Sequence, residues 1–512
     1  MPSVLAIDQG TTGTTCLVIA ADGRILGRAY SEFTQHFPQP GWVEHDASEI
    51  WEVSRRVARE ALAAARAGDR AGADVRGVGI TNQRETVVLW DRETLEPVAR
   101  AIVWQDRRTA PLCRALKDAG HEEEVRRRTG LVLDPYFSGT KISWLLTEHP
   151  ELRSRAESGE LAVGTIDSWL IARLTSGAVH ATDPTNASRT LLYNLRDRDW
   201  DERMLDLLGV PRALLPEPRS SSGDFGTVAG EHLGLDAPIA GVAGDQQSAL
   251  FGQGCTEPGL AKNTYGTGAF LLLHTGEEPV PSRHGLLTTV ACDARGGVAY
   301  ALEGSVFIAG AAVQWLRDGL GLLAHAEDSE AMARSVSDNQ GVYLVPAFVG
   351  LGAPHWEPDA RGMIVGLTRG TTRAHVVRAA LESMAYATAD VLTAMEADSG
   401  VKTTELRVDG GAASNDWLME FQAGLVGLPV RRPAVVETTA LGAAGLAGIA
   451  TGVWKGSEDF LAAQGEPRIF APTTSRAEAA RLQEGWARAV RAAVGWAHDQ
   501  PPARGTAGAR AG

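Results

Sequence analysis

The stretch that decides the fold is Val4-Leu5-Ala6-Ile7-Asp8-Gln9-Gly10-Thr11-Thr12-Gly13-Thr14-Thr15, an apolar run that enters a loop of glycine and threonine. A similar stretch occurs in the second half of the chain, where Asn263-Thr264-Tyr265-Gly266-Thr267-Gly268 leads into the apolar run 270–273. Glycine lets backbone N–H groups approach a phosphate closely, and a neighbouring threonine adds a hydroxyl donor. The pair predicts two related domains that grip one polyphosphate, such as that of ATP, from opposite sides.

Neither loop has the Gly-x-x-x-x-Gly-Lys-Ser/Thr pattern, and neither is expected to open a helix. Asp22-Gly23 lies between the apolar runs 16–20 and 25–29, which is a strong hairpin signal. The first loop is therefore predicted to join the first two strands of an antiparallel meander. An ordinary glycine-rich turn is the alternative, and it is easier to accept for one loop than for the matched pair.

The length predicts two domains, and the alternation of expected strands and helices in both halves predicts an α/β protein. The chain has 512 residues, with 44% apolar and 22% charged side chains and a net charge of −14. We expect one domain over residues 1–252, a second over 253–498 and a disordered tail over 499–512. The negative charge argues against nucleic acid or an anionic membrane surface as the main partner.

The cysteines and the apolar runs indicate a cytoplasmic protein. The four cysteines, Cys16, Cys113, Cys255 and Cys292, are far apart and have no metal-ligand spacing. We expect them to be buried thiols of a reducing compartment. There is no signal peptide pattern, and no apolar run approaches the roughly 20 residues that span a bilayer.

Two carboxylates follow apolar strands and could take part in phosphate chemistry. Asp8 ends the first strand and could hold Mg²⁺, usually through water. Asp245 follows the run 240–244 and could accept a proton from an attacking hydroxyl. Either carboxylate could instead be solvated or could cap a helix.

Other candidate binding residues also allow two interpretations when each is considered alone. The Arg84-Glu85 pair could bind substrate hydroxyls or form a surface ion pair. Trp104, Tyr136 and Phe270 could line a pocket or belong to the core. The Asp409-Gly410-Gly411 turn fits a nucleotide site or a plain tight turn.

Together these elements resemble the FGGY carbohydrate kinases of the actin/Hsp70/sugar-kinase superfamily. The resemblance runs from Val4 to about Trp496 and is carried by several motifs in order: 8–12, 40–46, 79–85, 101–105, 130–141, 244–252, 261–268, 346–354 and 407–415. It implies two ribonuclease H-like, actin-like ATPase domains with an ATP cleft between them.

Within that family the chain is similar to the members that phosphorylate glycerol. The resemblance therefore implies glycerol and ATP as substrates, Mg²⁺ as cofactor, sn-glycerol 3-phosphate as product, and a homodimer or homotetramer. A kinase for another small polyol or ketose is the alternative. A nucleotide-switch protein, such as an actin-like filament former or an Hsp70-type chaperone, is disfavoured by the polar pocket residues and by the absence of a peptide-binding C-terminal domain.

The family's site residues can be placed on this chain motif by motif. Asp245 matches the catalytic base, and Asp8 the Mg²⁺-associated carboxylate. The glycerol-binding positions are Arg84, Glu85, Tyr136, Asp245 and Gln246, with Trp104 and Phe270 as an apolar wall. The nucleotide positions are Thr11, Thr12, Gly13, Thr267, Gly310, Gln314, Gly411 and Asn415.

The chain departs from the family pattern at two positions. Thr15 stands where the family often has Arg, which predicts weaker ATP binding or a lower rate. Asp236 stands where some members have an Arg that binds fructose 1,6-bisphosphate, so inhibition by that anion is predicted to be absent. His232 lies near a position that other members phosphorylate, but its neighbours differ, and we expect a solvated loop histidine.

Overall fold

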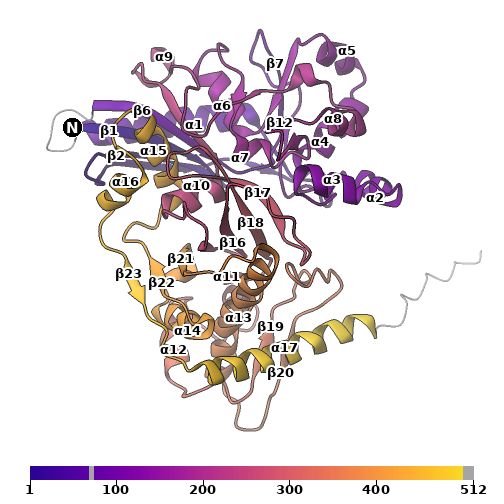
Figure 1. Ribbon diagram of the computed structural model, residues 1–512, viewed down its shortest axis with the longest axis vertical. Coiled ribbons are helices and arrows are strands. Elements are labelled where there is room, and N and C mark those ends of the chain that lie inside the picture. The colour runs from indigo at the N-terminus through magenta and orange to yellow at the C-terminus, as the bar shows by residue number, and fades with distance from the viewer. Residues whose placement is uncertain (68–73, 500–512) are drawn as a thin grey trace, which may run out of the picture.

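The computed structural model describes residues 1–67 and 74–499. The tail expected over 499–512 lies, apart from Asp499, outside the described residues. Two sheets dominate the fold (Figure 1), one built from the first half of the chain and one from the second. Among the described helices, none is long and apolar enough to cross a bilayer.

The first sheet has five strands in the order β14-β6-β1-β2-β3. The strands β1 to β3 form the predicted antiparallel meander, and β6 and β14 continue the sheet in parallel. The loop 10–12 joins the first two strands, and the turn at Asp22-Gly23 joins the next pair, as predicted. The bounds are β1 (Pro2–Gln9), β2 (Gly13–Ala20), β3 (Ile25–Glu32), β6 (Asp74–Asn82) and β14 (Ile239–Gly244).

The second sheet repeats this plan in seven strands, in the order β17-β18-β16-β15-β21-β22-β23. Strand β15 pairs antiparallel with β16 and parallel with β21, just as β1 pairs with β2 and β6. The bounds are β15 (Leu260–Tyr265), β16 (Ala269–Gly276), β17 (Leu287–Cys292), β18 (Val298–Val306), β21 (Glu405–Asp409), β22 (Val430–Arg432) and β23 (Arg468–Phe470).

Helices cover both faces of the first sheet. On one face lies α1 (Ala47–Ala67), whose buried side chains recur every three or four residues, including Ile50, Val57, Ala61 and Ala65. On the other face lie α10 (Asp245–Gly252) and α15 (Thr438–Ala450), which pack against each other. Figure 1 shows α15, which comes from the second half of the chain, beside β1 and β6.

Small residues on both sides of the contact let α15 pack closely against that sheet. A β-carbon placed on Gly79 of β6 would lie 2.2 Å from the carbonyl oxygen of Ala443. One placed on Gly241 of β14 would lie 2.4 Å from the backbone nitrogen of Ala447. Helix and strands therefore touch backbone to backbone. The Ala- and Gly-rich helix α15 thereby ties the C-terminal half to the first sheet.

The second sheet shares one hydrophobic core with helices of its own half. These include α11 (Gly310–Asp318), α13 (Arg373–Ser399), α14 (Asp416–Val426) and α17 (Arg476–His498). The segment between β6 and β14 carries shorter elements, among them β7 (Val88–Asp91), α6 (Ile166–Leu174), α7 (Pro184–Ala187) and α9 (Gly230–Leu233). The domain boundary expected after residue 252 stays a prediction.

Candidate active site

Two turns at one edge of the first sheet bring Arg84 and Asp245 together. Strand β6 ends at Asn82 and the chain turns through Gln83, Arg84 and Glu85, while β14 ends at Gly244 and α10 begins with Asp245. Gly244 and Asn82 are register partners in neighbouring parallel strands, so the two turns are adjacent. Polar groups at the carboxyl ends of parallel strands are typical of α/β binding sites.

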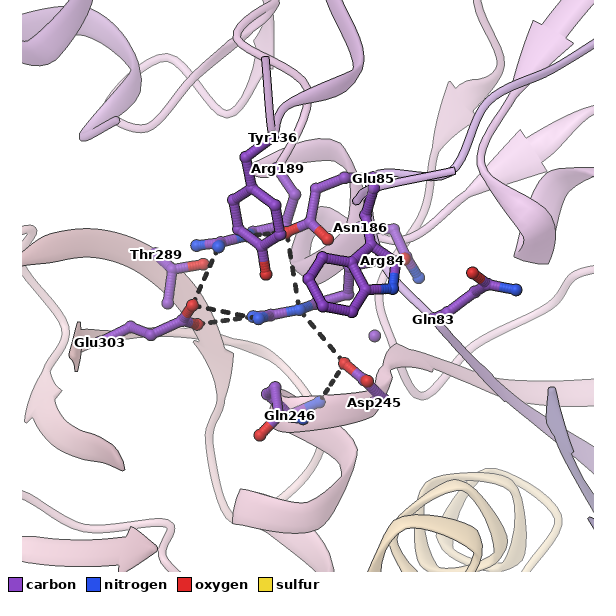
Figure 2. A network of polar contacts seen from close by, with 12 residues as sticks. Gln83, Arg84, Glu85, Tyr136, Asn186, Arg189, Asp245, Gln246, Thr289 and Glu303 are labelled. Atoms are coloured by element: carbon purple, nitrogen blue, oxygen red, sulfur yellow. Dashed lines mark hydrogen bonds and ion pairs between the residues drawn. The ribbon is translucent and has the colours of Figure 1, made fainter. Parts of the chain in front are cut away.

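Arg84 is the centre of a buried polar cluster (Figure 2). Its guanidinium donates two hydrogen bonds to Glu303, with lengths of 2.6 and 3.0 Å, and its Nε lies 3.2 Å from Asp245 Oδ1. Nη1 also donates to Gln247 Oε1 at 3.1 Å. The side chain of Arg84 is only 2% exposed, so the interpretation of Arg84-Glu85 as a surface ion pair is wrong.

Sequence reasoning missed two members of this cluster, Arg189 and Glu303. Arg189 Nε donates to Glu85 Oε1 at 2.7 Å, and its Nη2 donates to Glu303 Oε1 at 2.9 Å. Glu303 stands in the mostly apolar strand β18, and a carboxylate in such a strand indicates a buried charge pair. Arg189 follows the short helix α7 in a polar stretch and gave no comparable signal.

The two arginines govern the ionisation of the carboxylates that they hold. Burial opposes ionisation of Glu303, but Arg189 and Arg84 outweigh it and lower its pKa to about 2. Glu85 is also buried, and burial raises its pKa in spite of the same two arginines. Asp245 differs from both, because its side chain is 31% exposed while those of Glu85 and Glu303 are 2% or less. Asp245 is the member through which the cluster meets solvent.

The second phosphate loop lies against the start of a helix. Gly310 N–H donates to the carbonyl oxygen of Gly266 at 3.0 Å, and Ala311 N–H donates to that of Thr267 at 3.1 Å, so α11 begins directly on the loop. Gln314 is exposed one turn further along. In the first loop, Gly10 N–H donates to the carbonyl oxygen of Gly13 at 2.9 Å.

The residues predicted to bind the nucleoside follow β21, which is the parallel neighbour of β15. Thr264 and Asp409 are register partners, so the turn at Gly410-Gly411 lies beside the second phosphate loop. Gly411 is exposed. Asn415 Oδ1 accepts from the N–H of Leu418 at 2.9 Å and caps α14. The fold thus brings these predicted nucleotide residues to one edge of the second sheet.

Two family models match this chain, and together they cover most of it. The N-terminal domain of the FGGY family of carbohydrate kinases matches residues 3–252, and the C-terminal domain matches residues 261–451. The chain belongs to the FGGY family of carbohydrate kinases. The predicted two-domain kinase fold is therefore confirmed.

Individual proteins are similar to this FGGY kinase over nearly its full length. The chain is 59% identical to "Glycerol kinase" of Alkalilimnicola ehrlichii over 502 residues, which is 98% of this chain and 100% of that protein. It is 56% identical to "Glycerol kinase" of Deinococcus radiodurans, covering 97% of this chain and 98% of that one. Among solved structures, Plasmodium falciparum glycerol kinase with ADP superposes with a TM-score of 0.91 at 35% identity, covering 96% and 98% of the two chains.

The donor set of this FGGY kinase fits a magnesium ion that bound phosphates help to hold. Asp8 is half-buried, and its pKa is raised to about 7 by burial and by the neighbouring charge of Asp245. A divalent cation would relieve that repulsion. Over residues 1–67 and 74–499 there is no cluster of three or more His, Cys, Asp or Glu that could hold a metal alone. Mg²⁺ commonly takes one or two carboxylates and completes its shell with phosphates and water, and Asp8 offers one such carboxylate.

Aromatic side chains connect the cluster to the first phosphate loop. The rings of Trp104 and Tyr136 meet edge to face at 5.5 Å, and Trp104 Nε1 donates to Thr11 Oγ1 at 2.9 Å. The Tyr136 ring lies 5.7 Å from the Arg189 guanidinium. Phe270 comes from β16 of the other half and is half-buried. In the register of β16 and β18, Leu272 lies opposite Glu303, so these two side chains point to the same face of the second sheet. Phe270 is two residues before Leu272 and therefore shares that face.

The structure places both residues that depart from the family pattern, Thr15 and Asp236. Thr15 lies directly opposite Asp8 in the β1–β2 register, so the family's arginine would stand beside the predicted metal-associated carboxylate. Asp236 is exposed, and the absence of inhibition by fructose 1,6-bisphosphate stays a prediction.

The expectation of a solvated loop histidine at position 232 is wrong. His232 lies in the short helix α9, and its side chain is only 16% exposed. The ring packs edge-on against Trp51 with centroids 5.1 Å apart, and Nε2 is 2.9 Å from Ser176 Oγ. Burial lowers its pKa. The imidazole fills a gap between α9 and α1, and the sequence of the loop alone did not reveal that contact.

Proposed function

We propose that this kinase transfers the γ-phosphoryl group of ATP to a terminal hydroxyl of glycerol and releases sn-glycerol 3-phosphate. The full-length similarity to proteins named glycerol kinase supports the substrate. The observation that carries the mechanism is the position of Asp245, the solvent-reaching carboxylate of an otherwise buried cluster, held by Arg84 at 3.2 Å.

Each residue of the cluster then has a role in binding or proton transfer. Asp245 accepts the proton of the hydroxyl that attacks phosphorus. Arg84 fixes the direction of that carboxylate, and Arg189 fixes Glu85, which is left with an oxygen to accept from another hydroxyl. Trp104, Tyr136 and Phe270 cover the carbon chain.

The two loops hold ATP between the sheets. Backbone N–H groups and hydroxyls of the first loop (Thr11, Thr12 and Gly13) and of the second (Thr267) face the phosphates, and Gly310, Gln314, Gly411 and Asn415 line the nucleoside side. Asp8 would hold Mg²⁺ through water, and the ion would neutralise charge on the phosphate oxygens. We place the enzyme in the cytoplasm, where ATP is available and its four free cysteines stay reduced. A homodimer or homotetramer stays a prediction.

The proposal is tested by Asp245→Asn, which keeps the size of the side chain and removes its basicity. We expect kcat with glycerol to fall about 10²- to 10⁴-fold, because a positioned general base contributes about that much. The KM for ATP should change little. Asp206→Asn, in an exposed carboxylate of the helix over Glu202–Leu208, is the matched control and should keep full activity. A kcat for Asp245→Asn within threefold of the unmodified enzyme would contradict the role of Asp245.

A further inference from the structure

A second positive charge lies beside the Arg84 cluster, at the boundary of the two halves. Lys262 stands in β15 and is 0% exposed. Its Nζ donates to Gln246 Oε1 at 2.5 Å and to Thr264 Oγ1 at 2.8 Å. Gln246 is the residue after Asp245, and Thr264 is two residues before the glycine that begins the turn of the second phosphate loop. One ammonium group therefore joins the turn that carries Asp245 to the strand that leads into the loop 266–268.

The contact with Lys262 decides which way the Gln246 amide faces. An ammonium group can only donate, so the atom of Gln246 that meets it must be the carbonyl oxygen. The amide NH₂ is then left for an acceptor oxygen on the substrate side. Thr264 Oγ1 anchors the ammonium from its own strand, since residues 262 and 264 point to the same face of β15.

Burying an ammonium is costly, and here burial lowers the pKa of Lys262 to about 8, although Asp409, Asp245 and Glu303 favour its charged form. Its two hydrogen-bond acceptors, Gln246 Oε1 and Thr264 Oγ1, are neutral groups, which offset that cost less than a carboxylate would. A charge buried at this cost, bonded to the residue after Asp245, points to a role in positioning Gln246.

We infer that Lys262 is a positioning residue of the kinase reaction, which orients Gln246 so that its amide donates to the hydroxyl acceptor. The inference rests on the proposed function, because it assigns Gln246 to that acceptor. It adds a residue from the C-terminal half to the control of a binding group in the N-terminal half. It also predicts that loss of the lysine lowers kcat/KM for glycerol and leaves the KM for ATP unchanged.

The test compares Lys262→Met with Lys262→Arg and with the control Lys402→Met, whose side chain is 84% exposed. In Lys262→Met, kcat/KM for glycerol should fall about 10- to 100-fold, as expected for a misplaced binding group. The KM for ATP should stay within twofold. Lys262→Arg should recover part of the loss, and Lys402→Met should match the unmodified enzyme.

A double-mutant cycle with Gln246→Ala shows whether the lysine acts through the glutamine. In the Gln246→Ala background, Lys262→Met should lower kcat/KM for glycerol less than threefold. A fall of less than fivefold in Lys262→Met alone would overturn the inference. So would a larger fall that persists in the Gln246→Ala background, or one that lies only in the KM for ATP. If Lys262→Met does not fold, Lys262→Gln is measured by the same criteria.

The result separates this inference from the proposed function. If the unmodified protein does not turn over glycerol, the proposed function fails before any variant is compared. If it does turn over glycerol and Lys262→Met keeps full activity, only the role of Lys262 fails.

Discussion

The proposed acceptor site and the proposed nucleotide site are built in opposite ways. In the cluster around Arg84, the side chains of Arg84, Arg189 and Glu303 are buried, and both arginines bond Glu303. On the nucleotide side, Thr12, Thr267, Gln314 and Gly411 are exposed. Their contacts within the protein come mainly from the backbone, as where α11 begins on the second loop.

On the proposed function, this difference places the substrate specificity of the enzyme at the acceptor site. In that proposal, the small acceptor is bound by charged side chains that the fold holds in place through one another, which limits the cost of ordering them on binding. The nucleotide is bound by glycine-rich backbone and exposed polar side chains. Substitutions on the acceptor side should therefore change both stability and catalysis, while those on the nucleotide side should change the ATP requirement alone.

The largest effect is expected for Arg84→Met. The change leaves Asp245 without its guanidinium contact and Glu303 with Arg189 alone, and breaking a buried pair from one side costs about 3–5 kcal/mol. We expect a loss of about that size in the free energy of unfolding and a fall of about 10²- to 10³-fold in kcat/KM for glycerol. Urea unfolding and steady-state kinetics measure the two.

Arg481→Met is the control for that variant, because Arg481 forms an exposed ion pair with Glu478 and should leave both quantities unchanged. An Arg84→Met enzyme that is as stable and as active as the control would remove the contrast between the two sides.

A smaller effect, with a defined pH dependence, is expected for Glu303. Its pKa is lowered from 4.5 to about 2 in the folded state, so its ionised form stabilises the fold above about pH 4.5, and that stability is lost as the pH falls towards 2. The lost contribution is roughly 3 kcal/mol. Glu303→Gln should be less stable than the unmodified protein at pH 7 and should lose less stability between pH 5 and pH 2.

Urea unfolding at a series of pH values measures this slope. Glu382→Gln is the matched control, because burial raises the pKa of Glu382 instead of lowering it. That variant should keep the acid-sensitive slope. Equal slopes for Glu303→Gln and the unmodified protein would show that the arginines do not hold Glu303 ionised.

The smallest effect is expected on the nucleotide side, from Thr15→Arg. The new cation would stand opposite Asp8 and near the phosphates, where a partly exposed charge contributes modestly. We expect the apparent KM for ATP to fall about two- to fivefold, with kcat/KM for glycerol at saturating ATP unchanged. An unchanged KM for ATP would refute the role assigned to the missing arginine.

Local signals in the sequence predicted the parts of the fold that local chemistry determines. Asp22-Gly23 and the two glycine-threonine loops specify turns, so the meander and the repeat of the plan could be foreseen. Asp8 and Asp245 were found because each follows an apolar strand. These features depend on neighbours along the chain.

Contacts between distant segments could not be predicted in the same way. Arg84 meets Glu303 across 219 positions and Arg189 meets Glu85 across 104 positions, and no local pattern pairs them. The same holds for α15, whose Ala- and Gly-rich sequence indicated close packing but not that its partner is the first sheet. His232 was misjudged because Trp51, which buries it, belongs to another helix.

The most direct test is ADP release by the purified protein with Mg²⁺ and ATP, measured with glycerol, dihydroxyacetone, xylulose, ribulose, gluconate or no acceptor. We predict turnover with glycerol that exceeds every other acceptor, because a site built to hydrogen-bond its substrate rejects ill-fitting ones strongly. Faster turnover with a ketose or another polyol would keep the kinase mechanism but contradict the substrate. ADP release that is equal with and without acceptors would contradict the account of the acceptor site as a whole.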